Sequence, residues 1–135
     1  PMTIDISLLV LAVLIYMVMI LVQVVFSNLE HKPQDQLGPR DGLTDTSRMT
    51  GRAKRANANM VEALMMHVPL VLAVVLVDRA NDMSALGGWL FVAGRAAYAP
   101  LYWLGVPVLR TLAWLVAAAG TVLVLLQILP FSGAA

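Results

Sequence analysis

The polar residues of this chain gather in two short clusters inside long apolar segments. The first cluster opens the second apolar segment and contains Arg52, Arg55, Asn59 and Glu62. At 100° per residue, these four positions fall within an arc of about 80° on a helix. A helix there carries them as one stripe, which offers hydrogen-bond donors beside a carboxylate acceptor. A stripe of this kind suits a zwitterionic ligand, because it can hold both of the ligand's charges.

The second cluster lies in the middle of the third apolar segment and consists of Arg95, Tyr98 and Tyr102. On a helix these residues fall within an arc of about 60°. A charge at membrane depth costs roughly 2.5 to 3.5 kcal/mol on insertion scales, so it is normally buried in a bundle, paired and functional. The sequence therefore predicts that these two stripes form the functional site.

Glu62 has a functional and a structural interpretation. In the first, its carboxylate accepts from a ligand amine or keeps a ligand-binding arginine in place. In the second, it pairs with Arg95 only to neutralise two buried charges, and some pairing is expected because the helices are consecutive. A buried ion pair seldom stabilises more than an apolar pair of equal volume, so stability alone explains Glu62 poorly.

The other basic residues near helix ends also have two interpretations. Arg52, Lys54 and Arg55 can be interfacial anchors for anionic headgroups, and Lys54, which lies off the stripe, fits that role. Arg110, followed by Thr111, lies in the first turn or so of the fourth apolar segment. A cation is not favoured at the positive end of a helix dipole, so an anion is expected nearby, and a phospholipid phosphate is the simplest one.

Two further observations limit the chemistry. His67 has no second histidine or carboxylate at ligand spacing, so we expect a packed polar residue and no metal site. Cysteine is absent from the chain, which excludes a thiolate nucleophile of its own. Any thiol chemistry must therefore use a thiol that a ligand supplies.

Composition places the chain among membrane proteins. Of its 135 residues, 60% are hydrophobic and only 13% are charged. The uncharged runs from Ile6 to Phe26 and from Thr111 to Leu129 are each long enough to cross a bilayer. The second helix is expected to enter the membrane past Glu62, and the third requires a buried Arg95. We predict an all-α membrane protein with one domain, a four-transmembrane-helix bundle with helices at about 5–28, 50–78, 84–104 and 107–130.

The long polar segment between Ser27 and Gly51 is rich in Pro, Gly and Asp, and it is either a plain connector or a lid. Basic residues crowd this segment and the neighbouring helix starts, whereas the opposite connection has only Arg79. The positive-inside rule then predicts that both termini lie outside and that the polar stripes face the cytoplasm. The first apolar run has no preceding basic residues and no cleavage site, so we expect it to remain in the mature protein.

The combined pattern resembles the MAPEG family, the membrane-associated proteins in eicosanoid and glutathione metabolism. The resemblance rests on Arg55-x-x-x-Asn59-x-x-Glu62, on Arg95-x-x-Tyr98-x-x-x-Tyr102 and on Arg110 with a hydroxyl residue beside it. The four-helix layout, the long first loop and the basic cytoplasmic side agree with it. This resemblance implies a homotrimer with glutathione bound between subunits near the cytoplasmic side, and an apolar co-substrate that arrives from the lipid.

The resemblance also implies roles for individual residues. Arg55, Asn59 and Glu62 would hold the charged ends of glutathione, with Glu62 near the amine. Arg110 would stabilise the thiolate, with Thr111 where some members have serine. A free thiol with a pKa of about 8.5 is mostly protonated at neutral pH, and an adjacent cation lowers that pKa. The expected glutathione-binding residues are Arg52, Arg55, Asn59, Glu62, Arg95, Tyr98 and Tyr102, and the expected catalytic residues are Arg110 and Thr111.

Several positions differ from the pattern of some members. Tyr98 stands where several have histidine, and Met60 where some have aspartate. Asn57 and Ala58 stand where some have histidine and arginine, and the first helix lacks a basic residue that contacts the ligand in some eukaryotic members. These differences favour a bacterial-type member, in the bacterial inner membrane, over prostaglandin or leukotriene chemistry.

We therefore expect a microsomal-type glutathione transferase, or a glutathione-dependent peroxidase that acts on lipid hydroperoxides. The alternative is a non-catalytic protein of the same fold that binds a lipid or an anionic metabolite. A proton-coupled transporter that uses Glu62 and Arg95 is less favoured, because the acid has Arg, Asn and Tyr residues around it. Expected partners are further copies of the chain, membrane lipids and a small apolar electrophile, without nucleic acid.

Overall fold

The computed structural model describes residues 2–43 and 47–130, and their regular elements are all helices. The long helices lie within about two residues of the predicted bounds, and the short α2 inside the first loop was not predicted. In chain order the elements are α1 (Ile4–Glu30), α2 (Pro33–Leu37), α3 (Arg48–Leu76), α4 (Asp82–Trp103) and α5 (Pro107–Ile128).

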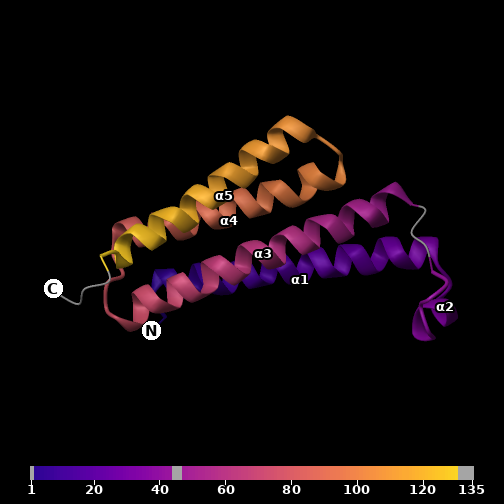
Figure 1. The fold of residues 1–135 in the computed structure, drawn as a ribbon, viewed down its shortest axis with the longest axis horizontal. Helices are drawn as coiled ribbons and strands as arrows, with labels where there is room; N and C mark the ends of the chain where they lie inside the picture. Colours follow the sequence, from indigo (N-terminus) through magenta and orange to yellow (C-terminus); the bar gives the residue numbers. More distant parts are fainter. Residues whose placement is uncertain (1, 44–46, 131–135) are drawn as a thin grey trace.

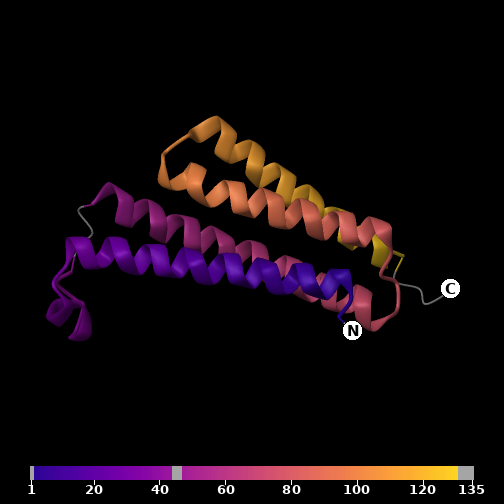
Figure 2. The same ribbon diagram turned by 180° about the vertical axis from the view of Figure 1, so that it is seen from behind.

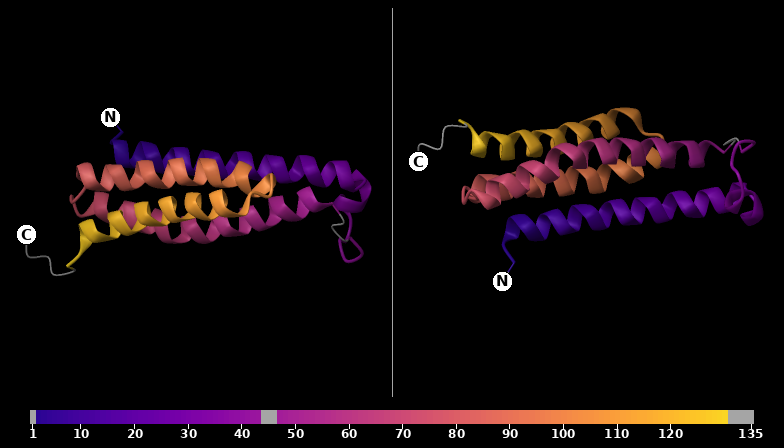
Figure 3. Two further views of the ribbon diagram at one scale, coloured as in Figure 1. Left: turned by 90° about the horizontal axis from the view of Figure 1, so that it is seen from above. Right: turned by 60° about the horizontal axis from the view of Figure 1, so that its bottom comes forward.

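The four long helices form an elongated bundle of two helix pairs. The α1/α3 pair lies beneath the α4/α5 pair in the view of Figure 1, and the view from behind in Figure 2 agrees. The most extensive packing joins α4 to α5, and α1 contacts both α3 and α4 (Figure 3). We call the end with the α1–α3 loop and the α4–α5 turn the loop end. At this end α1 and α3 extend beyond the α4–α5 turn (Figure 1).

Side-chain caps and turn residues set the helix boundaries. Ser47 accepts a hydrogen bond from the Thr50 amide at the start of α3. Asn81 begins α4 with a capping box, in which its side chain accepts from the Ser84 amide and the Ser84 hydroxyl accepts from the Asn81 amide. In the tight α4–α5 turn, Gly105 adopts a φ of 72°, which glycine tolerates best.

Small residues let α4 and α5 approach closely. A Cβ atom on Gly94 would lie 2.7 Å from both the Ala113 carbonyl oxygen and the Ala117 amide nitrogen. One on Gly87 would lie 2.6 Å from the Gly120 carbonyl oxygen. Backbone atoms cannot move aside as a flexible side chain can, so a side chain at either glycine would push the helices apart. The two glycines therefore permit the close packing of α4 on α5. The contact at Gly94 also fixes the position of its neighbour in the chain, Arg95.

Two arginines of the α3 region bond to the last turns of other helices. The Arg52 guanidinium donates to the Trp103 carbonyl oxygen at the end of α4, at 3.1 Å. Arg79 donates to the Ile128 carbonyl oxygen at the end of α5, at 2.8 Å. Both contacts satisfy carbonyl groups that lack a partner inside their helix, where a cation is also favoured by the helix dipole.

Three described helices are long and apolar enough to cross a membrane by length and composition, namely α1, α3 and α5. Much of the α1 surface is exposed and apolar, for example at Val10, Leu14 and Leu21, which agrees with contact to lipid. Helix α4 is not among the three, and it carries Arg95. The structure therefore supports an integral membrane protein, and the fourth span stays a prediction.

Candidate functional site

Arg95 of α4 is a buried cation at the centre of the predicted site. Its side chain is 1% exposed, and its Nη1 donates to the Asn59 side-chain oxygen of α3 at 2.8 Å. Its Nε donates to the Met60 sulfur at 3.1 Å, and its guanidinium carbon lies 4.3 Å from the centre of the Tyr98 ring. Among the described residues, its Nη2 has no hydrogen-bond partner and no carboxylate forms a salt bridge with it. Within the described parts of the chain, Arg95 therefore has one donor group without an acceptor, and its charge has no counter-charge.

Tyr102 connects Arg95 to two further cations at the loop end. Its ring lies 5.5 Å from that of Tyr98, and its hydroxyl accepts a hydrogen bond from the Arg55 Nε at 3.2 Å. The Arg110 guanidinium carbon lies 4.7 Å from the centre of the Tyr102 ring. Three guanidinium groups from α3, α4 and α5 thus surround two neighbouring tyrosines. We call Arg55, Asn59, Arg95, Tyr98, Tyr102 and Arg110 the arginine–tyrosine cluster.

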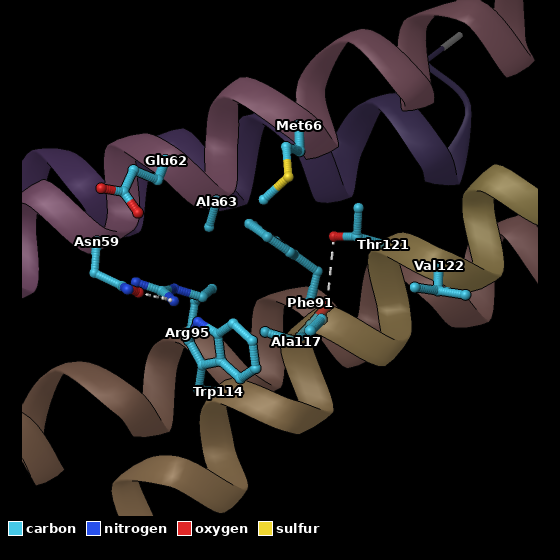
Figure 4. A pocket seen from close by; sticks show the side chains of 11 residues that line it. Asn59, Glu62, Ala63, Met66, Phe91, Arg95, Trp114, Ala117, Thr121 and Val122 are labelled. Atoms are coloured by element: carbon cyan, nitrogen blue, oxygen red, sulfur yellow. Dashed lines mark hydrogen bonds between the residues drawn. The ribbon is translucent and has the colours of Figure 1, made fainter.

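The predicted pairing of Glu62 with Arg95 is wrong. Glu62 is exposed, and no salt bridge joins it to Arg95 in the part of the chain that the structure describes. The reason is that Asn59 and Met60, up to one turn earlier on α3, take two of the arginine's donor groups. Figure 4 shows the Glu62 carboxylate at the same end of a cavity as the Arg95 side chain. It remains open to an incoming group.

Two other predicted residues make separate contacts. Arg52 bonds to the Trp103 carbonyl oxygen, as described above, and no contact that joins it to the arginine–tyrosine cluster is observed in the described parts of the chain. The exposed Thr111 donates to the Pro107 carbonyl oxygen of its own helix at 3.0 Å. Arg52 therefore caps the end of α4. Thr111 is next to Arg110 in the sequence, but its observed side-chain hydrogen bond is to Pro107.

A cavity of about 280 Å³ extends from this cluster between α3, α4 and α5. Its polar end is formed by Asn59, Glu62 and Arg95, and most of its remaining wall is apolar (Figure 4). We call it the site cavity. Its other lining residues are Ala63, Met66, Phe91, Trp114, Ala117, Ala118, Thr121 and Val122. A space with one charged end and an apolar body suits an anionic molecule and an apolar molecule side by side.

His67 is packed, as expected, but it contacts a cavity residue. Its ring stacks on Phe91 with centroids 3.8 Å apart, and its Nδ1 lies 3.0 Å from the Thr121 hydroxyl. Sequence reasoning missed Phe91, Trp114 and Thr121, because such residues in an apolar helix carry no polar signature. The one usable signal was the four-residue spacing from Arg110 to Trp114, which places both on one helix face.

Comparison with known proteins adds a family. The family model described as the MAPEG family matches residues 6–130, which include all of the predicted site residues. Searches of curated proteins and of solved structures found no match. The match covers nearly the whole chain and agrees with three apolar helices of membrane-spanning length. The chain therefore belongs to the MAPEG family, a family of membrane proteins.

Proposed function

We propose that the protein is a membrane-embedded, glutathione-dependent transferase or peroxidase. The MAPEG family includes glutathione transferases and peroxidases as well as non-catalytic members. The observation that carries the proposal is the arginine–tyrosine cluster, in which a buried Arg95 has no counter-charge among the described residues. A buried charge without a partner is strongly unfavourable, so an anionic ligand is the simplest explanation for its position.

The residues present fit glutathione, which carries two carboxylates, one ammonium group and a thiol. Arg95 lines the site cavity, and its Nη2 has no hydrogen-bond partner among the described residues. The exposed Arg55 offers a second cation for a carboxylate, and the exposed Glu62 offers an acceptor for the ammonium group. Charge-assisted hydrogen bonds of this kind are the stronger class, so the set can fix both ends of the peptide.

Arg110 is the group that we assign to the thiol. Its position over the Tyr102 ring holds the guanidinium at the edge of the cluster. A neighbouring cation lowers the pKa of a thiol and raises the fraction of nucleophilic thiolate at neutral pH. Thr111 adjoins it in sequence and is the second residue that we assign to the thiol; in this structure its hydroxyl donates to the Pro107 carbonyl oxygen. Because the chain has no cysteine, the thiol has to come from the ligand.

Bound glutathione supplies the nucleophilic sulfur. In transfer, a bond forms between sulfur and an electrophilic carbon as the bond to the leaving group breaks, and the leaving group departs with the electron pair. In peroxide reduction, sulfur takes the terminal oxygen as the O–O bond breaks, and the alkoxide takes a proton to become an alcohol. The resulting sulfenic acid condenses with a second glutathione, which gives the disulfide and water.

The assembly that we propose is a homotrimer of four-span subunits with the site between neighbours. Arg55 and Glu62 are exposed in the single chain, so a second subunit can complete the site around them. The proposed orientation places both termini outside and the loop end in the cytoplasm of a bacterium. Its support is the basic character of the loop end, where Lys32, Arg40, Arg48 and Lys54 lie.

A non-catalytic lipid-binding function is the second candidate. It is favoured by one observation, namely that most of the site cavity wall is apolar. In that case Arg95 and Arg110 would bind the anionic head of a lipid. Thiol activation would then not occur.

Turnover by the purified protein tests the proposal. We expect conjugation of a chlorodinitrobenzene or reduction of cumene hydroperoxide, with glutathione, to fall by about 10²- to 10³-fold in Arg110→Ala. Arg79→Ala, at the opposite end of the bundle, is the matched control and should keep its turnover. An Arg110→Ala protein that folds and turns over normally would refute the thiolate role. If neither the parent protein nor any variant shows turnover, and lipid copurifies, the lipid-binding function is supported in place of the catalytic one.

A further inference from the structure

We propose that the deep end of the site cavity binds an elongated apolar molecule through a hydroxyl group of that molecule, with Thr121 as the acceptor. As the second substrate of the enzyme, this molecule rests on the proposed function. Its binding, however, needs neither glutathione nor turnover. The proposal concerns a residue pair, His67 and Thr121, to which neither the cluster nor the thiol chemistry gives a role.

The hydrogen bonds of the Thr121 hydroxyl leave it able to accept a further hydrogen bond but not to donate one. Its Oγ1 lies 3.0 Å from His67 Nδ1 and 3.4 Å from the Ala117 carbonyl oxygen. If Nδ1 carries a hydrogen, it donates to Thr121, whose own hydrogen goes to Ala117, and one lone pair remains. If Nδ1 carries none, Thr121 donates to it and two lone pairs remain. With either tautomer, Thr121 keeps a free acceptor and no free donor, so its complement is a ligand O–H or N–H group.

His67 fixes this hydroxyl in place. The histidine ring is 2% exposed, and it stacks nearly parallel on Phe91, with an angle of 7° between the rings. Phe91 is fully buried and also lines the cavity, so the histidine cannot turn without disturbing the wall. His67 is therefore a positioning residue, which acts through Thr121.

The shape of the cavity sets the length of the ligand. Trp114 and Thr121 both line it from α5, and their separation of seven residues corresponds to about 10 Å along the helix axis. The polar end beside Arg95 and the hydroxyl of Thr121 lie toward opposite ends in Figure 4. Between them the wall is mostly apolar, with Ala63 and Ala118. These features are complementary to a hydroxylated aliphatic chain whose reacting group lies near Trp114.

Quenching of Trp114 fluorescence tests the inference without glutathione. In a full-length Trp89→Phe, Trp103→Phe protein, Trp114 is the remaining tryptophan. The probes are bromooctane and ω-bromooctanol, whose heavy atom quenches tryptophan; the alcohol also carries a hydroxyl at the other end of its chain. We expect saturable quenching by the alcohol at a roughly three- to tenfold lower concentration than by the bromoalkane, which is the effect of one hydrogen bond.

Variants assign that difference to Thr121. Thr121→Val should abolish it and Thr121→Ser should restore it, whereas Thr50→Val, the same change at the start of α3, should leave it intact. Ala118→Leu, which fills the cavity, should weaken saturable quenching by both probes. If Thr121→Val does not fold, the probe pair in the parent protein and in Ala118→Leu decides. Equal quenching by the two probes in the parent, or a difference that persists in Thr121→Val, would overturn the inference.

The outcome is separable from that of the proposed function. If the protein discriminates between the two probes but shows no glutathione turnover, the hydroxyl-binding site is supported and the enzymatic function is refuted. If the protein turns over glutathione but does not discriminate between the probes, the enzymatic function is supported and the hydroxyl-binding site is refuted.

Discussion

Replacement of Arg95 by methionine should separate ligand binding from stability. Met is an unbranched side chain that fills an irregular space well and carries no charge. Arg95 is 1% exposed and has only uncharged partners among the described residues, namely Asn59, Met60 and Tyr98. We therefore expect the variant to lose affinity for glutathione while the ligand-free protein stays as stable as the parent or becomes more stable.

The magnitudes follow from these contacts. Desolvation of a single buried ion costs several kcal/mol, and the Arg95→Met substitution removes that cost. The loss of the bond to Asn59 costs about 1.5 to 3 kcal/mol, and the loss of the contact with the Tyr98 ring about 0.5 to 2 kcal/mol. The two sides nearly cancel for the ligand-free protein. For the ligand, one lost charge-assisted bond of about 1.5 to 3 kcal/mol weakens binding by roughly 10- to 140-fold.

Two assays in mild detergent measure the two effects. Titration calorimetry gives the dissociation constant of glutathione, and thermal unfolding without and with glutathione gives the stabilisation by the ligand. Arg79→Met is the matched control, since it removes an arginine that caps α5 at the opposite end of the bundle. It should lower the unfolding temperature and leave glutathione affinity unchanged. If Arg95→Met instead unfolds at a lower temperature and binds glutathione as tightly as the parent, Arg95 is structural and the reasoning fails.

Three further predictions concern single side chains. Tyr102→Phe removes the hydroxyl that accepts from Arg55 at 3.2 Å, so the KM for glutathione should rise roughly two- to tenfold, and an unchanged KM would contradict this contact. Gly94→Ala places a Cβ 2.7 Å from the Ala117 amide nitrogen and should destabilise the protein by about 1 to 3 kcal/mol, seen as earlier thermal unfolding. Thr50→Val removes a fully buried hydroxyl that has no partner among the described residues, so stability should rise by about 1 kcal/mol, and earlier unfolding would argue against it.

The sequence predicted much of the helix layout and the membership of the arginine–tyrosine cluster. Long uncharged runs and the Gly and Pro residues between them define the helices. The stripes were predictable because helical periodicity places Asn59 on a known face and because consecutive helices connected by a short turn lie side by side. Arg95 and Asn59 accordingly meet across α3 and α4.

Periodicity could not fix depth to within one turn or reveal what faces a helix end. The arginine–carboxylate pair was predicted from facing stripes, yet Asn59 and Met60 reach Arg95 and Glu62 does not. Arg52 lies on the same stripe, but it meets the end of α4 because α3 extends beyond the α4–α5 turn (Figure 1). The role of Thr121 could not be predicted from the sequence, because it depends on a cavity that three helices form together.

The thiolate absorbance of bound glutathione tests the central claim most directly. We expect a saturable ultraviolet difference band when glutathione is added to the purified protein, because Arg110 favours the thiolate. Arg110→Ala should lose the band while it still folds, and Glu62→Ala should lose it through weaker binding. A parent protein that shows neither this band nor any thermal stabilisation by glutathione would contradict the account.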